Sequence, residues 1–162
     1  MVNSSEHLRK KSFTFFVLFS TCTIFAVGKN VAMDLLIDAN ILLAVILNEP
    51  EKERIVELTA EAKIVAPEMI PYEIGNALSA MMKRHRLTQE QVQITFKIFE
   101  AIPIRLEQVN IADALGLSHR FCIYAYDAYY LEVARRLHIP LLTLDRQMKN
   151  IGHSLKIELL EV

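Results

Sequence analysis

Glycine is scarce in this sequence, with only four glycines among 162 residues. A loop that cradles phosphate groups with its backbone needs several glycines close together, so nucleotide-binding proteins of that kind are excluded. Tryptophan is absent, and the two cysteines, Cys22 and Cys122, are far apart and outside any metal-ligand spacing. These cysteines provide neither a disulfide framework nor a zinc site, and a reducing compartment such as the cytoplasm fits best.

The sequence also lacks an excess of positive charge. It has 18 Lys and Arg residues against 19 Asp and Glu residues, and from Met33 onward the balance is 14 against 18. A protein that holds nucleic acid by bulk charge carries a basic excess. That mode of binding is therefore excluded.

A long apolar run occurs near the N-terminus. After the basic segment HLRKK, residues 12–28 form an uncharged run of about 17 residues, the lower limit for a membrane-spanning helix. A basic start, an apolar middle and a small-residue end are typical of a signal peptide or a short anchor. Alternatively, residues 1–32 are an upstream extension outside the mature protein, because an orderly domain begins at Met33. We expect the extension, and no membrane association unless 12–28 is a real targeting segment.

Strand-like and helix-like segments alternate from Met33 to Val162. Continuous apolar runs or alternating patterns predict five strands, at 34–38, 63–66, 102–109, 141–144 and 155–162. Helical spacing and capping residues predict helices at 40–48, 50–62, 71–86, from Thr88 onward, 111–121, 127–137 and from 146 to about 152. This alternation predicts one α/β domain over 33–162, a sandwich with a mostly parallel sheet.

Acidic side chains occur at the ends of several predicted elements. Asp38 and Asp145 close predicted strands, whereas Glu73 and Asp127 stand in the first turns of predicted helices. Ligands of parallel sheets bind at the carboxyl ends of the strands, so we expect the four acids to meet there. Carboxylates gathered in a protein interior repel one another unless a cation compensates them. The pattern therefore predicts a divalent metal site.

Each of these residues also has a purely structural explanation. Asp38 precedes a helix and could be its N-cap, and Asn40 could either cap that helix or orient the carboxylate of Asp38. Glu73 and Asp127 are favoured by the helix dipole in the first turn. However, both lie on packed helix faces, where an acid is less expected. Thr143 points to the same side of its strand as Asp145, so its hydroxyl could support the site.

Four motifs carry a resemblance to a known family. LLIDANILLA, PYEIGNAL, YDAYYLEVARRL and LLTLD, in this order and at these separations, resemble the PIN domain of VapBC toxin nucleases over residues 33–162. The resemblance implies a three-layer α/β/α fold with a five-stranded sheet in the order 3-2-1-4-5, which makes strands 1 and 4 neighbours. It also implies an endoribonuclease that needs Mg²⁺ or Mn²⁺, acts on RNA, forms a homodimer and is inhibited by a cognate antitoxin. By motif, the acidic quartet corresponds to Asp38, Glu73, Asp127 and Asp145, and its polar partner to Asn40.

In this interpretation Asp38 and Asp127 hold the main ion, and Glu73 and Asp145 add ligands or orient its waters. Carboxylates and water are the ligands that Mg²⁺ and Mn²⁺ prefer. Three other functions stay open: an inactive PIN-type scaffold, a DNA 5′ nuclease, and a signalling module phosphorylated on Asp38. Several basic residues either track the RNA backbone or form solvated faces: Lys83, Arg84, Arg86, Arg120 and Arg146.

Overall fold

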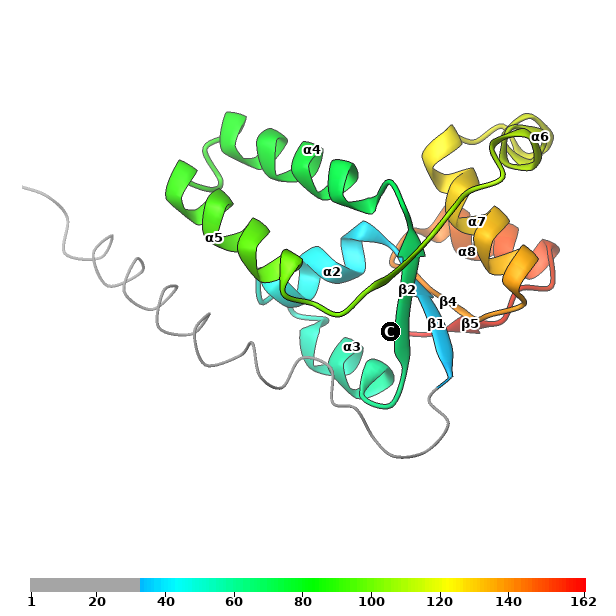
Figure 1. Cartoon of the computed structure of the whole chain (residues 1–162), viewed down its shortest axis with the longest axis horizontal. Coiled ribbons are helices and arrows are strands. Elements are labelled where there is room, and N and C mark those ends of the chain that lie inside the picture. Colours follow the sequence, from blue (N-terminus) through cyan, green and yellow to red (C-terminus); the bar gives the residue numbers. More distant parts are fainter. Residues whose placement is uncertain (1–32) are drawn as a thin grey trace, which may run out of the picture.

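The computed structural model describes residues 33–162, which form a five-stranded sheet between two layers of helices (Figure 1). The predictions for residues 1–32 lie outside the described residues. All four strand pairs are parallel, and the strand order is β3-β2-β1-β4-β5. This order confirms the predicted one. The strands are β1 (Asp34–Ile37), β2 (Lys63–Pro67), β3 (Arg105–Glu107), β4 (Leu141–Leu142) and β5 (Leu159–Leu160).

The helices that connect the strands divide between the two faces of the sheet (Figure 1). One face is covered by α2 (Ala39–Ile46), α3 (Lys52–Thr59), α4 (Ile70–Lys83) and α5 (Gln89–Glu100). The other face is covered by α6 (Ile111–Phe121), α7 (Ala125–Leu137) and α8 (Arg146–Ser154). The chain changes face between β3 and β4, and the sheet is therefore the middle of three layers. No helix within 33–162 is both long and apolar enough to cross a membrane.

The central strand shows why a continuous apolar run suits this sheet. Leu35 and Ile37 pack into the core beneath α2 to α5, whereas Leu36 between them packs into the core beneath α6 to α8. All three side chains are fully buried. Side chains of a strand alternate between its faces, so only an apolar residue at every position fills both cores.

Most helix boundaries follow from local chemistry. The predicted capping box between Thr88 and Gln91 is present at the start of α5. Helices α6 and α7 end at Cys122 and His138, which adopt left-handed conformations with φ of 52° and 55°. Glycine normally takes such positions. Because this chain has few glycines, other residues take these positions here.

The last three strands are shorter than the sequence predicts, and β3 covers only Arg105–Glu107 of the predicted 102–109. Segment 155–162 was expected to be a strand throughout, but Leu155 caps α8 and Lys156 has a left-handed φ of 58°, so pairing begins only at Leu159. Strand β4 ends before Thr143. The hydroxyl of Thr143 accepts a hydrogen bond from the backbone amide of Asp145, which turns the chain into α8.

Candidate active site

The candidate site begins where β1 and β4 end side by side. The backbone amide of Asp38 donates a hydrogen bond to the carbonyl of Leu142 at 3.4 Å, so the chain leaves both strands at the same level. Helix α2 starts directly after Asp38, at Ala39. The side chain of Asp38 is 1% exposed, which is unusual for a carboxylate.

Thr143 links the two strand-terminal aspartates. Its hydroxyl donates to Oδ2 of Asp38 at 2.6 Å and accepts from the backbone amide of Asp145 at 2.9 Å. The other oxygen of Asp38, Oδ1, accepts from the backbone amide of Ile41 at 2.8 Å. Both oxygens of Asp38 are thus held by donors, which fixes the orientation of the carboxylate. The support expected from Thr143 is present.

A second link joins the two helices that carry the other acids. The hydroxyl of Tyr130 in α7 donates to Oε2 of Glu73 in α4 at 2.7 Å. Tyr130 is 1% exposed, and burial together with the Glu73 carboxylate raises the pKa of its hydroxyl well above 10. The hydroxyl therefore remains a donor at neutral pH. This bond brings the first turn of α4 beside α7, on which Asp127 lies one turn before Tyr130.

The four acids act on one another electrostatically and form what we call the acidic cluster: Asp38, Glu73, Asp127 and Asp145. Burial raises the pKa of Asp38, the hydrogen bonds from Thr143 and Ile41 lower it, and the charges of Glu73 and Asp145 raise it, with a net change from 3.8 to about 6. Burial and the charge of Asp127 raise the pKa of Glu73, although the bond from Tyr130 lowers it. Burial and the charge of Asp145 raise the pKa of Asp127. Within 33–162 no Lys or Arg forms an ion pair with any member.

Side-chain capping explains only half of the cluster, whereas Glu73 and Asp127 lie in the first turns of α4 and α7, where the helix dipole favours an acid. Asp38 and Asp145 are N-caps, since Asp38 accepts from Ile41 and Oδ1 of Asp145 accepts from the backbone amide of Met148 at 2.7 Å. Tyr124, the N-cap of α7, makes no side-chain cap hydrogen bond, and Asp127 has no hydrogen bond to a described residue. The possible capping role of Asn40 is wrong: Asp38 caps α2, and Asn40 lies exposed in its first turn. Helix capping therefore explains neither Glu73 nor Asp127.

The cluster suits a hydrated cation better than a fully dehydrated one. Like charges without a compensating cation favour the binding of a positive ion, and carboxylate oxygens suit Mg²⁺ or Mn²⁺. However, no three His, Cys, Asp or Glu side chains within 33–162 lie close enough together to hold an ion directly. Mg²⁺ usually keeps several of its waters. Carboxylates that are too far apart to bind the ion directly can still contact a hydrated ion through those waters.

Comparison with known proteins identifies the family. The sequence pattern of the PIN domain matches residues 35–154. The chain belongs to the PIN domain family. It is 26% identical over 121 residues to Ribonuclease VapC3 of Pyrobaculum aerophilum, covering 72% of this chain and 92% of that protein. The crystal structure of PAE2754 from the same organism shares the fold, with a TM-score of 0.56 at 22% identity over 78% of this chain and 98% of that one.

One residue of this PIN domain site was not predicted to take part in it. The sequence placed Asp127 on a packed helix face, but the bond from the hydroxyl of Tyr130 to Glu73 was not predicted. A signal did exist, because a tyrosine three residues after a first-turn acid lies on the same helix face and carries a hydroxyl that needs a partner when buried. What the sequence could not supply is the partner, which is 57 residues away.

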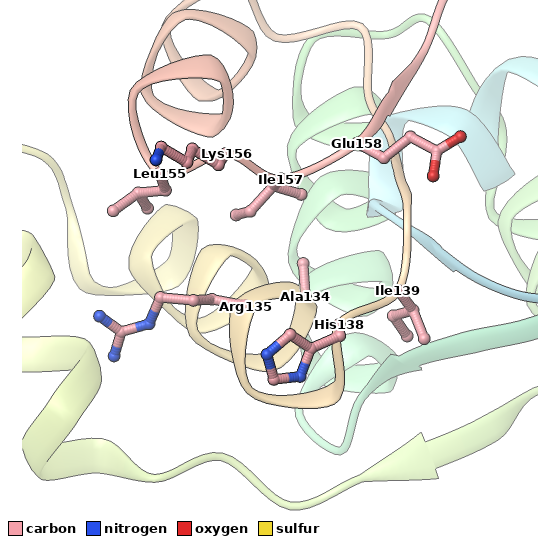
Figure 2. A pocket seen from close by; sticks show the side chains of 8 residues that line it. All are labelled: Ala134, Arg135, His138, Ile139, Leu155, Lys156, Ile157 and Glu158. Atoms are coloured by element: carbon pink, nitrogen blue, oxygen red, sulfur yellow. The ribbon is translucent and has the colours of Figure 1, made fainter.

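A pocket of about 360 Å³ lies elsewhere on the PIN domain (Figure 2). It is lined by residues that precede β4 and β5, among them Arg135, His138, Lys156 and Glu158, and therefore lies at the amino ends of the strands. Figure 2 shows that Arg135 and Glu158 point away from each other at its borders. The acidic cluster lies at the carboxyl ends of the strands and contributes no residue to this pocket.

Proposed function

We propose that this protein is a metal-dependent endoribonuclease that cleaves phosphodiester bonds of RNA with Mg²⁺ or Mn²⁺. The observation that carries the proposal is the acidic cluster, in which four carboxylates meet at one edge of a PIN domain and no cation of the described chain compensates them. Repulsion between these like charges lowers the stability of the protein when no cation is bound. Such an arrangement is consistent with function rather than with stability.

The residues of the cluster differ in how firmly they are held. Asp38 is fixed by donors on both oxygens, and Asp145 is fixed through Oδ1. Glu73 is fixed through Oε2, which leaves Oε1 without a hydrogen bond to a described residue. Asp127 is only partly buried and has no such bond on either oxygen. Asp127 therefore has the most available oxygens, and Glu73 and Asp145 each have one oxygen without such a bond.

These differences assign roles to the residues. Asp38, Glu73, Asp127 and Asp145 would hold a hydrated ion, chiefly through its waters. When bound, a divalent ion supplies Lewis acidity at a phosphate and lowers the pKa of water. Asp127 and Glu73 would orient water toward the phosphate, while Thr143 and Tyr130 keep Asp38 and Glu73 in place. Asn40, exposed beside Asp38, would contact the substrate or its water.

The biological setting follows from the similarity to Ribonuclease VapC3. We propose that the protein is the toxin of a toxin–antitoxin module in the cytoplasm. Its partners would be an RNA substrate, a cognate antitoxin that inhibits it, and a second copy of the chain. Residues 1–32 would be an extension of the nuclease domain at 33–162.

The experiment that tests the proposed function maps RNA ends. Total RNA is incubated with the full chain in Mg²⁺ or EDTA, and with the variants Asp127→Asn and Asp113→Asn. Asp113 is an exposed acid in the first turn of α6 and serves as the matched control. We expect new ends with the wild type and with Asp113→Asn in Mg²⁺, and none in EDTA or with Asp127→Asn.

The same experiment separates the alternatives. Identical RNA ends with the wild type and Asp127→Asn would reject a metal-dependent nuclease and favour an inactive scaffold. A parallel incubation with DNA tests the DNA 5′ nuclease. Incubation with acetyl phosphate tests the signalling module, which would gain a phosphate on Asp38.

A further inference from the structure

Every tyrosine of the chain lies close in sequence to Glu73 or Asp127, within residues 72–73 or 124–130, which we call the two tyrosine segments. The five are Tyr72, Tyr124, Tyr126, Tyr129 and Tyr130. Three of them are exposed although tyrosine is a large, mostly apolar side chain: Tyr72 by 74%, Tyr124 by 85% and Tyr126 by 44%. They are the exposed large aromatic residues of the part that the structure describes.

The exposed tyrosines lie next to the acidic cluster. Tyr72 directly precedes Glu73 in the first turn of α4, Tyr126 directly precedes Asp127 in the first turn of α7, and Tyr124 is the N-cap of α7. The bond from Tyr130 to Glu73 holds these two turns beside each other. Successive residues of a helix point about 100° apart, so a tyrosine beside an inward-pointing acid faces the solvent next to the cluster.

One of the rings is held in place by a neighbour. The ring of Tyr126 packs against the ring of Tyr129 at a centroid distance of 5.7 Å and an interplanar angle of 57°. Tyr129 is itself half-buried. A ring that is supported on one side and open on the other loses little conformational entropy when a flat ligand stacks on it.

We propose that Tyr72, Tyr124 and Tyr126 form a base-stacking surface that positions unpaired nucleotides of the RNA at the acidic cluster. This inference rests on the proposed function and assigns to it the residues that contact the substrate. Unpaired bases stack on aromatic side chains regardless of their sequence, whereas bases in a duplex have no free face. The residues from Met33 onward carry 14 basic against 18 acidic groups, so the basic groups are too few to hold RNA by charge. Stacking provides a way to bind RNA that does not depend on charge.

Exposed tyrosines are also common in surfaces that bind proteins. The position of these three favours RNA, because they adjoin the groups that would act on a phosphate. A protein partner would leave the affinity for RNA independent of the tyrosines. The affinity of tyrosine variants for RNA therefore separates the two kinds of partner.

The experiment measures the binding of fluorescein-labelled oligouridine by fluorescence anisotropy with the full chain. Ca²⁺ replaces Mg²⁺, and a gel checks that the RNA stays intact. The variants are Tyr72→Ala, Tyr124→Ala and Tyr126→Ala, each with its Phe counterpart, which keeps the ring. Leu115→Ala is the control, because Leu115 is 52% exposed on α6 and lies outside the two tyrosine segments.

We expect each Ala variant to raise the dissociation constant about tenfold. The Phe variants and Leu115→Ala should stay within about twofold of the wild type, since stacking needs the ring and not the hydroxyl. A blunt RNA duplex of the same length should bind more weakly than oligouridine and should not respond to the Ala variants. RNA binding that is unchanged in all three Ala variants, or absent in the wild type, would overturn the proposal and assign the tyrosines to a protein contact.

Cleavage of the same oligouridine in Mg²⁺ separates this inference from the proposed function. A wild type that binds through its tyrosines but does not cut would support stacking and contradict the nuclease. A wild type that cuts while its Ala variants bind and cut equally well would support the nuclease and contradict stacking.

Discussion

Asp38→Asn should make the protein more stable at neutral pH in the absence of metal. Asp38 is 1% exposed, and burial with the nearby charges of Glu73 and Asp145 raises its pKa from 3.8 to about 6. Asparagine has nearly the same shape and carries no charge at any pH. Its carbonyl oxygen can still accept the hydrogen bond from the amide of Ile41. The substitution therefore removes the buried charge and leaves the helix cap in place.

The magnitude follows from the difference between the two pKa values. Between pH 3.8 and pH 6 the folded protein keeps the proton on Asp38 while the unfolded chain loses it, so stability falls as the pH rises through this window. Above pH 6 both states are ionised and the loss is complete, at roughly 3 kcal/mol. Part of this gain is offset because the amide of asparagine replaces an oxygen that accepts from Thr143. We expect a net gain of about 2 kcal/mol at pH 7.5.

The assay is thermal unfolding of the full chain in EDTA between pH 4 and pH 8, for wild type, Asp38→Asn and Asp113→Asn. A gain of about 2 kcal/mol corresponds to a rise of the melting temperature by about 4–8 °C. The rise should vanish near pH 4, where Asp38 is protonated in the folded wild type. Asp113→Asn replaces an exposed first-turn acid that accepts a hydrogen bond from Asn110, and it should lower stability by less than about 1 kcal/mol.

Mg²⁺ should make the wild type more stable than Asp38→Asn. In the proposed function Mg²⁺ binds the folded wild type and should stabilise it in proportion to the logarithm of its concentration, whereas Asp38→Asn should gain little. The reasoning is refuted if Asp38→Asn is less stable than the wild type at pH 7.5 in EDTA, or if the difference is the same at pH 4 and pH 7.5.

Three further substitutions test the supports of the fold and the site. Thr143→Val removes the donor to the buried carboxylate of Asp38 and should lower the free energy of unfolding by about 1–3 kcal/mol, measured by urea unfolding, whereas Thr143→Ser should retain most of it. Arg136→Met leaves Glu132, which is 1% exposed, without its partner at 2.7 Å and should cost about 3 kcal/mol, with cleavage per folded molecule unchanged; a loss below about 0.5 kcal/mol would contradict this. Cys122→Gly places glycine at a φ of 52° and should raise the melting temperature by the equivalent of about 0.5 kcal/mol; a lower melting temperature would show that the left-handed backbone is not strained.

The sequence predicted the layers of the fold well because the apolar pattern is strong there. The run around Leu36 fits only a strand buried on both faces, and the Thr88 capping box fits only a helix start. Strand order is different, because no local pattern says which strands are neighbours. It came from the resemblance of the motifs to a family.

Features that depend on residues far apart in the chain could not be predicted from the sequence. Asn40 and Asp38 are both good capping residues, and only the backbone path decides that Asp38 caps α2. Glu132 and Arg136 have the i, i+4 spacing of an exposed ion pair. In the structure Glu132 is buried, because it also accepts a hydrogen bond from the backbone amide of Asn110, which is 22 residues away. Burial of a charge by a remote segment leaves no local signal.

We propose that the acidic cluster forms one cation-dependent site that cuts RNA. Its most direct test is the rate of RNA cleavage as a function of Mg²⁺ concentration, with the full chain as wild type, Asp38→Asn and Asp113→Asn. We predict a wild-type rate that rises with Mg²⁺ to a plateau and is abolished by EDTA, the same curve for Asp113→Asn, and a rate at least about a hundredfold lower for Asp38→Asn at every Mg²⁺ concentration. Cleavage by Asp38→Asn at the wild-type rate, or a wild-type rate that does not depend on Mg²⁺, would contradict the claim.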